Sequence, residues 1–419
     1  LQKRPPFEYV ATMSASPTEA SFIHLINRDV TERYFVFIND TNQISVYDLN
    51  GNQKTVTYPN GTTYLTCADA KTAFRAITVA DYTFVANTET TVAMENTLSP
   101  AFPFTGLIAV KQGDYNQRFT VYLDGSVAAD ITTSATDQVQ TRTDDIASRL
   151  ATAISGNANF TATANGSTVV ITKTGNATFT LATYDSLGDT GLSPTVGTVQ
   201  RFDDLPQHAP NGYIAQVQGD QTNNFDDYYV KFVADSGSSS TSSSGTWIET
   251  ARPNIQFEIN PSTMPHLLIR QPDGSFTFEQ AEWGDRAVGD EFSIPTPTFV
   301  GKKLSDIFFF QNRLGVLAGE NVVMSRTSEY FDFFATTART LLDNDPIDVA
   351  ASHTKVSLLK HAIPFDSRLL LFSDQTQFIL KGADFLTPKN TRWCPTPTFQ
   401  MQQMSQATSP NISLMVSTA

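Results

Sequence analysis

The residues of this sequence that could do chemistry are mostly carboxylates. They form two pairs and one short acidic segment: Asp203 and Asp204, Asp226 and Asp227, and Asp343, Asp345 and Asp348 within LLDNDPID. Such acids could serve a glycosidase or hold calcium. Adjacent residues of a strand point to opposite faces, however, so a pair does not flank one bond. The LLDNDPID segment also lacks the glycine and the terminal Glu of a calcium-binding hand. We therefore interpret these acids as turn formers.

Histidine and cysteine chemistry is equally sparse. The five histidines are His24, His208, His266, His353 and His361, and no two of them are closer than eight residues. None lies in a metal-binding motif, and serine-nucleophile, phosphate-loop and dinucleotide-binding motifs are absent. Cys67 and Cys394 are too few for a disulfide framework, so we interpret both as small buried hydrophobic residues. The sequence predicts no catalytic, cofactor-binding or metal residue and no enzymatic activity.

Aromatic residues give the other candidate surface. Tyr330, Phe331, Phe333 and Phe334 could form a platform for a glycan, but we favour packing, with Phe331 and Phe333 inward and Asp332 outward. Trp247 and Trp283 each stand beside charged residues, which suits protein contacts as readily as sugar.

Composition favours a β-rich protein of two to four domains. Hydrophobic residues make up 40% of 419 residues, and Phe, Val, Ile and Thr dominate the apolar runs. A formal net charge of −14 argues against the usual basic surface that grips nucleic acid phosphates. No apolar run approaches the length of a membrane span. The chain begins LQKRPPFEYV without Met and stops at SLMVSTA, so we expect it to be part of a longer protein.

Four stretches share one pattern of apolar strand, polar corner, apolar strand, turn and further strand. They are residues 33–58, 76–94, 307–324 and 362–380. Their second strands are expected to begin near 33, 82, 313 and 368, which gives spacings of 49, 231 and 55. Two spacings are typical of β-propeller blades, and the third implies an insertion of roughly 180 residues between blades. The sequence therefore predicts a mainly β fold of propeller-like meanders with inserted domains.

The insertion has a different character. A hairpin turning at Asp124 and Gly125 precedes a helix, TDDIASRLATAISGN, capped by Thr143 and ended by Gly156. Further strands turn at 165–166 and 175–176, which predicts a small ββαββ domain. A Ser/Gly-rich loop at 236–245 joins two later strands, and Pro295 and Pro297 mark the return to the propeller. The expected segments are residues 1–105 (first propeller-like part), 106–205 (ββαββ domain), 206–300 (β-rich insert) and 301–419 (second, incomplete propeller-like part).

Several stretches together carry a family resemblance. LQKRPPFEYVAT, GLIAVKQGDYNQRFTVYLDG, INPSTMPHLLIRQPDGSFTF, FFFQNRLGVLAGENVVMSRTSEYFDFF and the segment from Asp343 to Leu380 occur in family order over most of the chain. They resemble the tail tubular protein B family of short-tailed bacteriophages, the nozzle of the tail. The QNRLG…S…YFDFF block is the most specific.

That resemblance implies a structural protein of the virion tail, assembled in the bacterial cytoplasm. It implies a homo-hexamer that docks on an adaptor ring of the tail tubular protein A type, carries tail fibres and meets the host cell envelope. Double-stranded DNA would pass through its lumen without sequence-specific binding. The acidic composition favours a lumen lined mainly by Asp, Glu, Ser, Thr and Asn, with Arg313 and Arg368 in ion pairs. The alternative is a propeller that binds or degrades cell-surface glycan.

Overall fold

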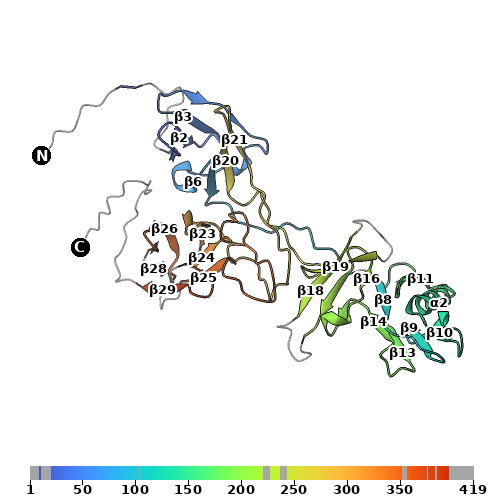
Figure 1. Cartoon of the computed structure of the whole chain (residues 1–419). Helices are drawn as coiled ribbons and strands as arrows, with labels where there is room; N and C mark the ends of the chain where they lie inside the picture. Colours follow the sequence, from blue (N-terminus) through green and yellow to red (C-terminus); the bar gives the residue numbers. More distant parts are fainter. Residues whose placement is uncertain are drawn as a thin grey trace.

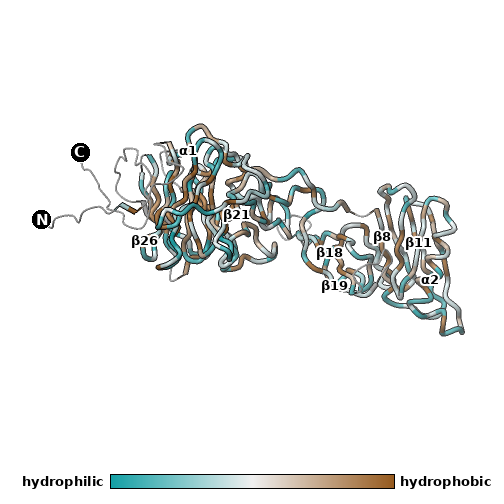
Figure 2. The backbone as a smooth tube through the Cα atoms, turned by 90° about the horizontal axis from the view of Figure 1, so that it is seen from above, coloured by the Kyte–Doolittle hydropathy of each residue, from teal (hydrophilic) through white to brown (hydrophobic). Residues whose placement is uncertain are grey.

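A computed structural model gives the fold of the chain. It describes residues 9–10, 20–102, 104–219, 227–235, 243–351, 356–374, 376–382 and 385–395, with backbone only at residue 243 and from residue 393 on. Strands account for 43% and helices for 7%, which confirms the mainly β prediction. The chain forms a stack of four sheets and a separate lobe that projects from it (Figure 1). Seen from above, the molecule is elongated, with the stack at one end and the lobe at the other (Figure 2).

Each sheet of the stack is a largely antiparallel meander. Sheet 1 contains β1 (Phe22–Asn27), β2 (Arg33–Ile38), β3 (Ile44–Asp48) and β4 (Gln53–Lys54). Sheet 2 contains β6 (Phe74–Val79), β7 (Tyr82–Asn87), β20 (His266–Arg270), β21 (Phe276–Gln280) and β5 (Val56–Thr57). Sheet 3 contains β22 (Asp306–Phe310), β23 (Arg313–Ala318), β24 (Asn321–Met324) and β25 (Ile347–Ala350). Sheet 4 contains β26 (Leu359–Phe365), β27 (Arg368–Ser373), β28 (Gln377–Lys381) and β29 (Arg392–Pro395).

The second strand of each meander begins where the sequence predicts. Strands β2, β7, β23 and β27 start at residues 33, 82, 313 and 368. Ala80, Asn312 and Asp366 adopt positive φ at three of the corners, a conformation that Asn and Asp tolerate better than other residues that carry a Cβ. These corners are short, and a short hairpin turn determines which residues of its two strands are paired. The corners therefore set the register of the first two strands of these three meanders.

Three apolar cores join the sheets face to face. One lies between sheets 1 and 2, a second between sheets 2 and 3, and a third between sheets 3 and 4. Strand β23 is buried along its whole length, since Leu314 and Val316 face the second core while Leu317 faces the third. Such two-sided burial explains why its sequence is apolar without alternation.

The first strands of the four sheets lie beside one another. His24 of β1 is 2.8 Å from the hydroxyl of Thr78 of β6. Asp306 of β22 accepts a hydrogen bond from the backbone N–H of Ala362 of β26 at 2.9 Å. Strands β6 and β22 are also in contact. No closed propeller is found among the described residues, since no apolar core joins sheet 1 to sheet 4.

The place of the insertion was predicted wrongly. Residues 90–94 were expected to be the third strand of their unit, yet they form only isolated bridges at Thr91 and Met94. The third strand is β20, in which His266 is paired with Val85 of β7. The insertion thus lies inside the second meander, and residues 266–280 belong to the stack. Sequence pattern alone misses this because the two halves of the hairpin are far apart in the chain.

The lobe contains two packed units. The first joins a sheet of β10 (Ser126–Thr132), β9 (Arg118–Leu123) and β13 (Leu181–Asp185) to a sheet of β11 (Phe160–Asn165), β12 (Thr168–Lys173), β8 (Thr105–Val110) and β14 (Leu192–Thr195). Helix α2 (Thr143–Ser155) shares their core. The second unit is a sheet of β15 (Thr198–Val199), β17 (Ile214–Val217), β18 (Tyr228–Ala234), β19 (Ser243–Thr250) and β16 (His208–Ala209).

The helix of the lobe differs in detail from its prediction. It begins at Thr143, but the N-cap residue is Arg142 and no side chain caps the first turn. Asp144 pairs with Arg142 instead. Gly156 ends the helix as expected, with its N–H bonded to the carbonyl of Ala153. The unit exceeds the predicted ββαββ pattern because β8 and β14 complete the second sheet.

The remaining short elements connect the sheets. They are η1 (Thr63–Leu65), α1 (Ala70–Ala73), η2 (Val139–Thr141) and η3 (Phe202–Asp204). In the described part of the chain, no helix is long and apolar enough to span a membrane.

Candidate functional site

The histidines are dispersed over the fold. His266 is buried and stacks on Tyr64 with ring centroids 3.9 Å apart, and burial lowers the pKa of its imidazole to about 4. His208 lies 3.3 Å from the Ser244 hydroxyl, and His361 lies 3.6 Å from Asp306. His353 is outside the described residues. Within the described ranges, no three His, Cys, Asp or Glu side chains group as a metal site would require.

Of the paired acids, Asp204 and Asp227 are held by different neighbours, and Asp203 lies in the short helix η3. Asp204 lies within 4 Å of Lys111 and Arg201. Buried Asp227 accepts from the Gln216 amide at 2.8 Å, whereas Asp226 lies outside the described residues.

The three acids of LLDNDPID also diverge. Asp343 pairs with Lys389 on the surface, Asp345 accepts from the N–H of Leu342, and Asp348 binds Thr298. Their carboxylates face three different neighbours, so they do not form one cage for a cation.

The aromatic segment packs as expected but not as a strand. Phe333 and Phe334 are buried between sheets 2 and 3, and Phe331 contacts Tyr82, Phe84 and Trp283. Residues 330–334 form turns and bends, so strand alternation does not set their directions. Asp332 instead pairs with Arg326 at 3.0 Å.

The other single residues considered in the sequence contact neighbours within their own part of the fold. Trp247 donates to the carbonyl of Pro206 and packs on Phe232. Cys67 is a half-buried free thiol, and burial raises its pKa. The side chain of Cys394 lies outside the described part of the chain. Arg313 is buried and binds backbone carbonyls rather than a carboxylate, which corrects the expectation of an ion pair.

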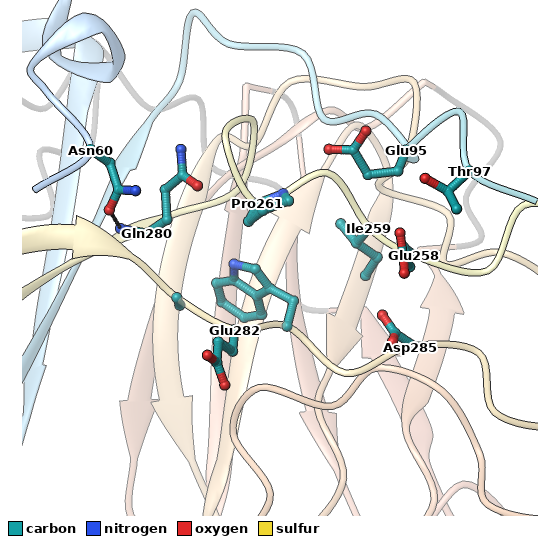
Figure 3. A pocket seen from close by; sticks show the side chains of 11 residues that line it. Asn60, Glu95, Thr97, Glu258, Ile259, Pro261, Gln280, Glu282 and Asp285 are labelled. Atoms are coloured by element: carbon teal, nitrogen blue, oxygen red, sulfur yellow. Dashed lines mark hydrogen bonds between the residues drawn. The ribbon is translucent and has the colours of Figure 1, made fainter. Parts of the chain in front are cut away.

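One pocket lies where the lobe joins the stack. It has a volume of about 500 Å³ and is formed by three segments around Glu95, Glu258 and Asp285, with Asn60 at one side. Figure 3 shows these three carboxylates in one row, whereas Glu282 lies across the pocket. The segments are tied together by the main chain, since the N–H of Glu95 donates to the carbonyl of Glu258 at 2.9 Å. Asn60 accepts from the N–H of Gln280 and fixes the end of β21.

The electrostatics of the pocket disfavour the ionised form of Asp285. Burial, followed by the negative charges of Glu258 and Asp332, raises the pKa of the Asp285 carboxyl. No Lys, Arg or His is among its lining residues. Sequence reasoning missed this site because the acids come from three distant segments. The only signal was Trp283 within EQAEWGDRAV, which lines the pocket.

Comparison with known proteins decides the family. A model of bacteriophage nozzle proteins matches residues 1–409. The chain belongs to the bacteriophage nozzle protein family. A relative of this nozzle chain is the tail tubular protein gp12 of Escherichia phage T7, which is 36% identical over 422 residues. The match covers 97% of this chain and 52% of the relative, so the chain spans about half the length of that protein.

Membership in the nozzle family confirms three predictions. The chain is a structural protein of the phage tail, it is a component of the virion, and it is not an enzyme. Family membership therefore argues against the alternative of a glycan-degrading propeller. The packing of Trp283, which is 7% exposed, also leaves no broad indole face for a sugar ring.

Proposed function

We propose that this chain forms part of a hexameric tail nozzle through which the phage genome leaves the virion. The family match over residues 1–409 is the observation that carries this proposal. A ring built by repeating one heterologous contact closes without leaving an unpaired surface. The rigid stack supports such a contact, because its three apolar cores hold four sheets as one body.

The stack is proposed to be an arc of a β-propeller. Four successive meanders with their first strands side by side are typical of consecutive blades. Sheet 1 and sheet 4 then form the two ends of the arc, and further strands of the full-length protein would close it. The division into residues 1–105, 106–205, 206–300 and 301–419 remains a prediction, modified by the return of β20 and β21 to the stack.

A mostly negative or neutral lumen suits passage of DNA. Each exposed Lys or Arg against the phosphates would add attraction, multiplied by the number of subunits. The net charge of −14 supports a wall of Asp, Glu, Ser, Thr and Asn. Burial of Arg313 removes one cation from any surface.

The partners follow from the same role. We propose that one end of the ring docks on an adaptor ring like that of tail tubular protein A, that its sides carry tail fibres, and that its tip meets the host envelope. The projecting lobe offers a surface for such docking away from the stack (Figure 1).

Native mass spectrometry of the full-length protein tests the ring directly. We expect a species of six copies, and electron microscopy of intact particles should place it around the channel at the tail. A strictly monomeric protein at assembly concentrations, or a lumen covered with Lys and Arg, would refute the proposal.

A further inference from the structure

The buried carboxyl group of Asp345 is not accounted for by its hydrogen bonds. The side chain is 1% exposed, and one of its oxygens accepts from the backbone N–H of Leu342 at 2.6 Å. The other oxygen is buried and has no hydrogen-bond partner among the described residues. Burying an acid in this way is unfavourable, and a neutral asparagine would close the same turn. The turn alone therefore does not explain a carboxylate at this position.

The residue that follows is proline, which makes the Asp345–Pro346 peptide bond chemically distinct. It is the one Asp–Pro bond of the sequence. The proline nitrogen belongs to a tertiary amide, and it takes up a proton and leaves more readily than the nitrogen of other residues. A carboxyl oxygen of an aspartate can also reach the carbonyl carbon of its own residue through a small ring. An Asp–Pro bond therefore carries both its own nucleophile and a good leaving group.

The fold adds a positive donor at the carbonyl oxygen of this bond. The guanidinium of Arg313 donates to the Asp345 carbonyl at 2.6 Å. Burial lowers the pKa of Arg313 to about 10, and the negative charge of Asp345 opposes that shift, so the guanidinium is positively charged at neutral pH. A cationic donor that is already in place stabilises negative charge as it develops on a carbonyl oxygen. The nucleophile, the carbonyl and the donor thus meet at one buried turn before β25.

We propose that the chain cleaves its own backbone between Asp345 and Pro346. The unpartnered carboxylate oxygen of Asp345 forms a bond to the carbonyl carbon of the same residue, while Arg313 stabilises the charge on the carbonyl oxygen. The bond from that carbon to the Pro346 nitrogen then breaks, and the nitrogen takes a proton from water. The hydroxide formed in that step opens the cyclic anhydride on Asp345 and leaves two carboxyl groups. One water is consumed overall, and nothing is oxidised or reduced.

The surroundings of the bond suit both the reaction and a structural protein. Asn344 is exposed and Pro346 is half-buried, so solvent lies next to the bond. The two products would stay together, because β25 remains paired with β24 and the third core contains residues from both sides of the break. Cleavage would free the end of the loop 325–345 without taking the stack apart. It occurs once per chain and involves no substrate, so it does not depend on the ring proposed above.

Intact-mass spectrometry of the folded and the unfolded chain tests the inference. The protein is kept at pH 5 in buffer and in concentrated urea, and near-UV circular dichroism checks that the sample in buffer is folded. We expect one fragment that ends at Asp345 and one that begins at Pro346. They should form at least about tenfold faster in buffer than in urea, because only the folded chain holds the Arg313 donor in place. Ordinary acid lability gives the reverse order, since an unfolded chain reaches the reactive geometry more freely.

Variants connect the cleavage to its nucleophile and its leaving group. Asp345→Asn keeps an acceptor for the Leu342 N–H but lacks the carboxylate, and Pro346→Ala replaces the leaving group. Each should slow cleavage in buffer at least about tenfold. Asp366→Asn, a change at an exposed acid in the β26–β27 turn, is the control and should leave the rate unchanged. Absence of both fragments, a rate in urea that equals or exceeds the rate in buffer, or an undiminished rate in Asp345→Asn would each overturn the proposal.

Discussion

Arg313 donates a hydrogen bond of 2.6 Å from its guanidinium to the backbone carbonyl of Asp345. The same guanidinium binds the carbonyls of Ser325 and Asp343, at 2.8 and 3.0 Å. Arg313 is 1% exposed, and burial lowers its pKa to about 10. A charge at the first position of β23 therefore holds together β24 and the loop before β25. Arg368 also stands at the start of a strand, yet its side chain is exposed. Position at a strand start therefore does not reveal that Arg313 is buried and bound to carbonyls.

Replacing Arg313 should destabilise the stack strongly. Arg313→Met leaves two buried carbonyls and one partly buried carbonyl without this donor, so we expect a loss of about 3 kcal/mol in the free energy of unfolding. The stability of Arg313→Lys should lie between that of the parent protein and that of Arg313→Met. A lysine ammonium keeps a positive donor, but it cannot reach all three acceptors in the same plane. Urea denaturation measures both. Arg368→Met is the matched control and should change stability by less than about 0.5 kcal/mol. A similar effect at both positions would contradict the role assigned to Arg313.

Gly315 is required by its contact across β22 and β23. A Cβ at this position would lie 2.1 Å from the ring of Phe308. Gly315→Ala should therefore destabilise the stack by about 1–3 kcal/mol through overpacking. The double variant Gly315→Ala with Phe308→Leu should recover part of this loss relative to the sum of the single changes, as a double-mutant cycle would show. Strict additivity would mean that the ring is not the obstacle.

Stability should fall with acid because of His266. Burial lowers the pKa of this imidazole to about 4, so the folded protein keeps it neutral while the unfolded chain takes up a proton near pH 6.5. The unfolded state then binds more protons between these values, and stability present above pH 6.5 is lost as pH falls toward 4, by up to about 1.4 kcal/mol per pH unit.

His266→Phe isolates this contribution. The phenyl ring can keep the stack on Tyr64 but cannot titrate. Urea midpoints at pH 7 and pH 5 should therefore differ less in this variant than in the parent protein. His208→Gln is the control for loss of a histidine in the lobe. An unchanged pH dependence in His266→Phe would contradict the assignment.

Glu249 should restrain the lobe against the stack. Its two carboxylate oxygens accept from the hydroxyl of Thr337 at 3.0 Å and the N–H of Ala338 at 3.1 Å. Nearby, Arg339 of the same loop lies over the ring of Tyr228, 5.4 Å from its centre. Glu249→Ala removes both hydrogen bonds between β19 of the lobe and the loop at 337–338, and should widen the range of lobe orientations.

Electron spin resonance can measure that range. Spin labels at Ser148 in α2 and at Lys303 in the stack, both exposed, report the distance between the two bodies after Cys67 and Cys394 are replaced by Ser. The distance distribution should broaden in Glu249→Ala and stay unchanged in Glu279→Ala. A narrow distribution in both would show that other contacts fix the lobe.

Local features of the fold were predictable, and long-range ones were not. Asp81, Asn312 and Asp366 marked corners, because turn chemistry depends on a few adjacent residues. The partner of β7 was missed, since it follows a large insertion and its sequence resembles any other apolar strand. The acidic pocket was missed for the same reason, as Glu95 and Glu258 meet only after β7 and β20 have paired.

Because β7 and β20 are antiparallel neighbours, the whole projecting lobe is topologically the loop of one hairpin. The entropy of closing a loop rises only slowly with its length, so the sheet tolerates a loop of almost any size once its two strands are paired. The stack and the lobe can therefore change independently during evolution. A lobe can be lengthened, replaced or lost at this one junction while the order of strands in the stack stays the same.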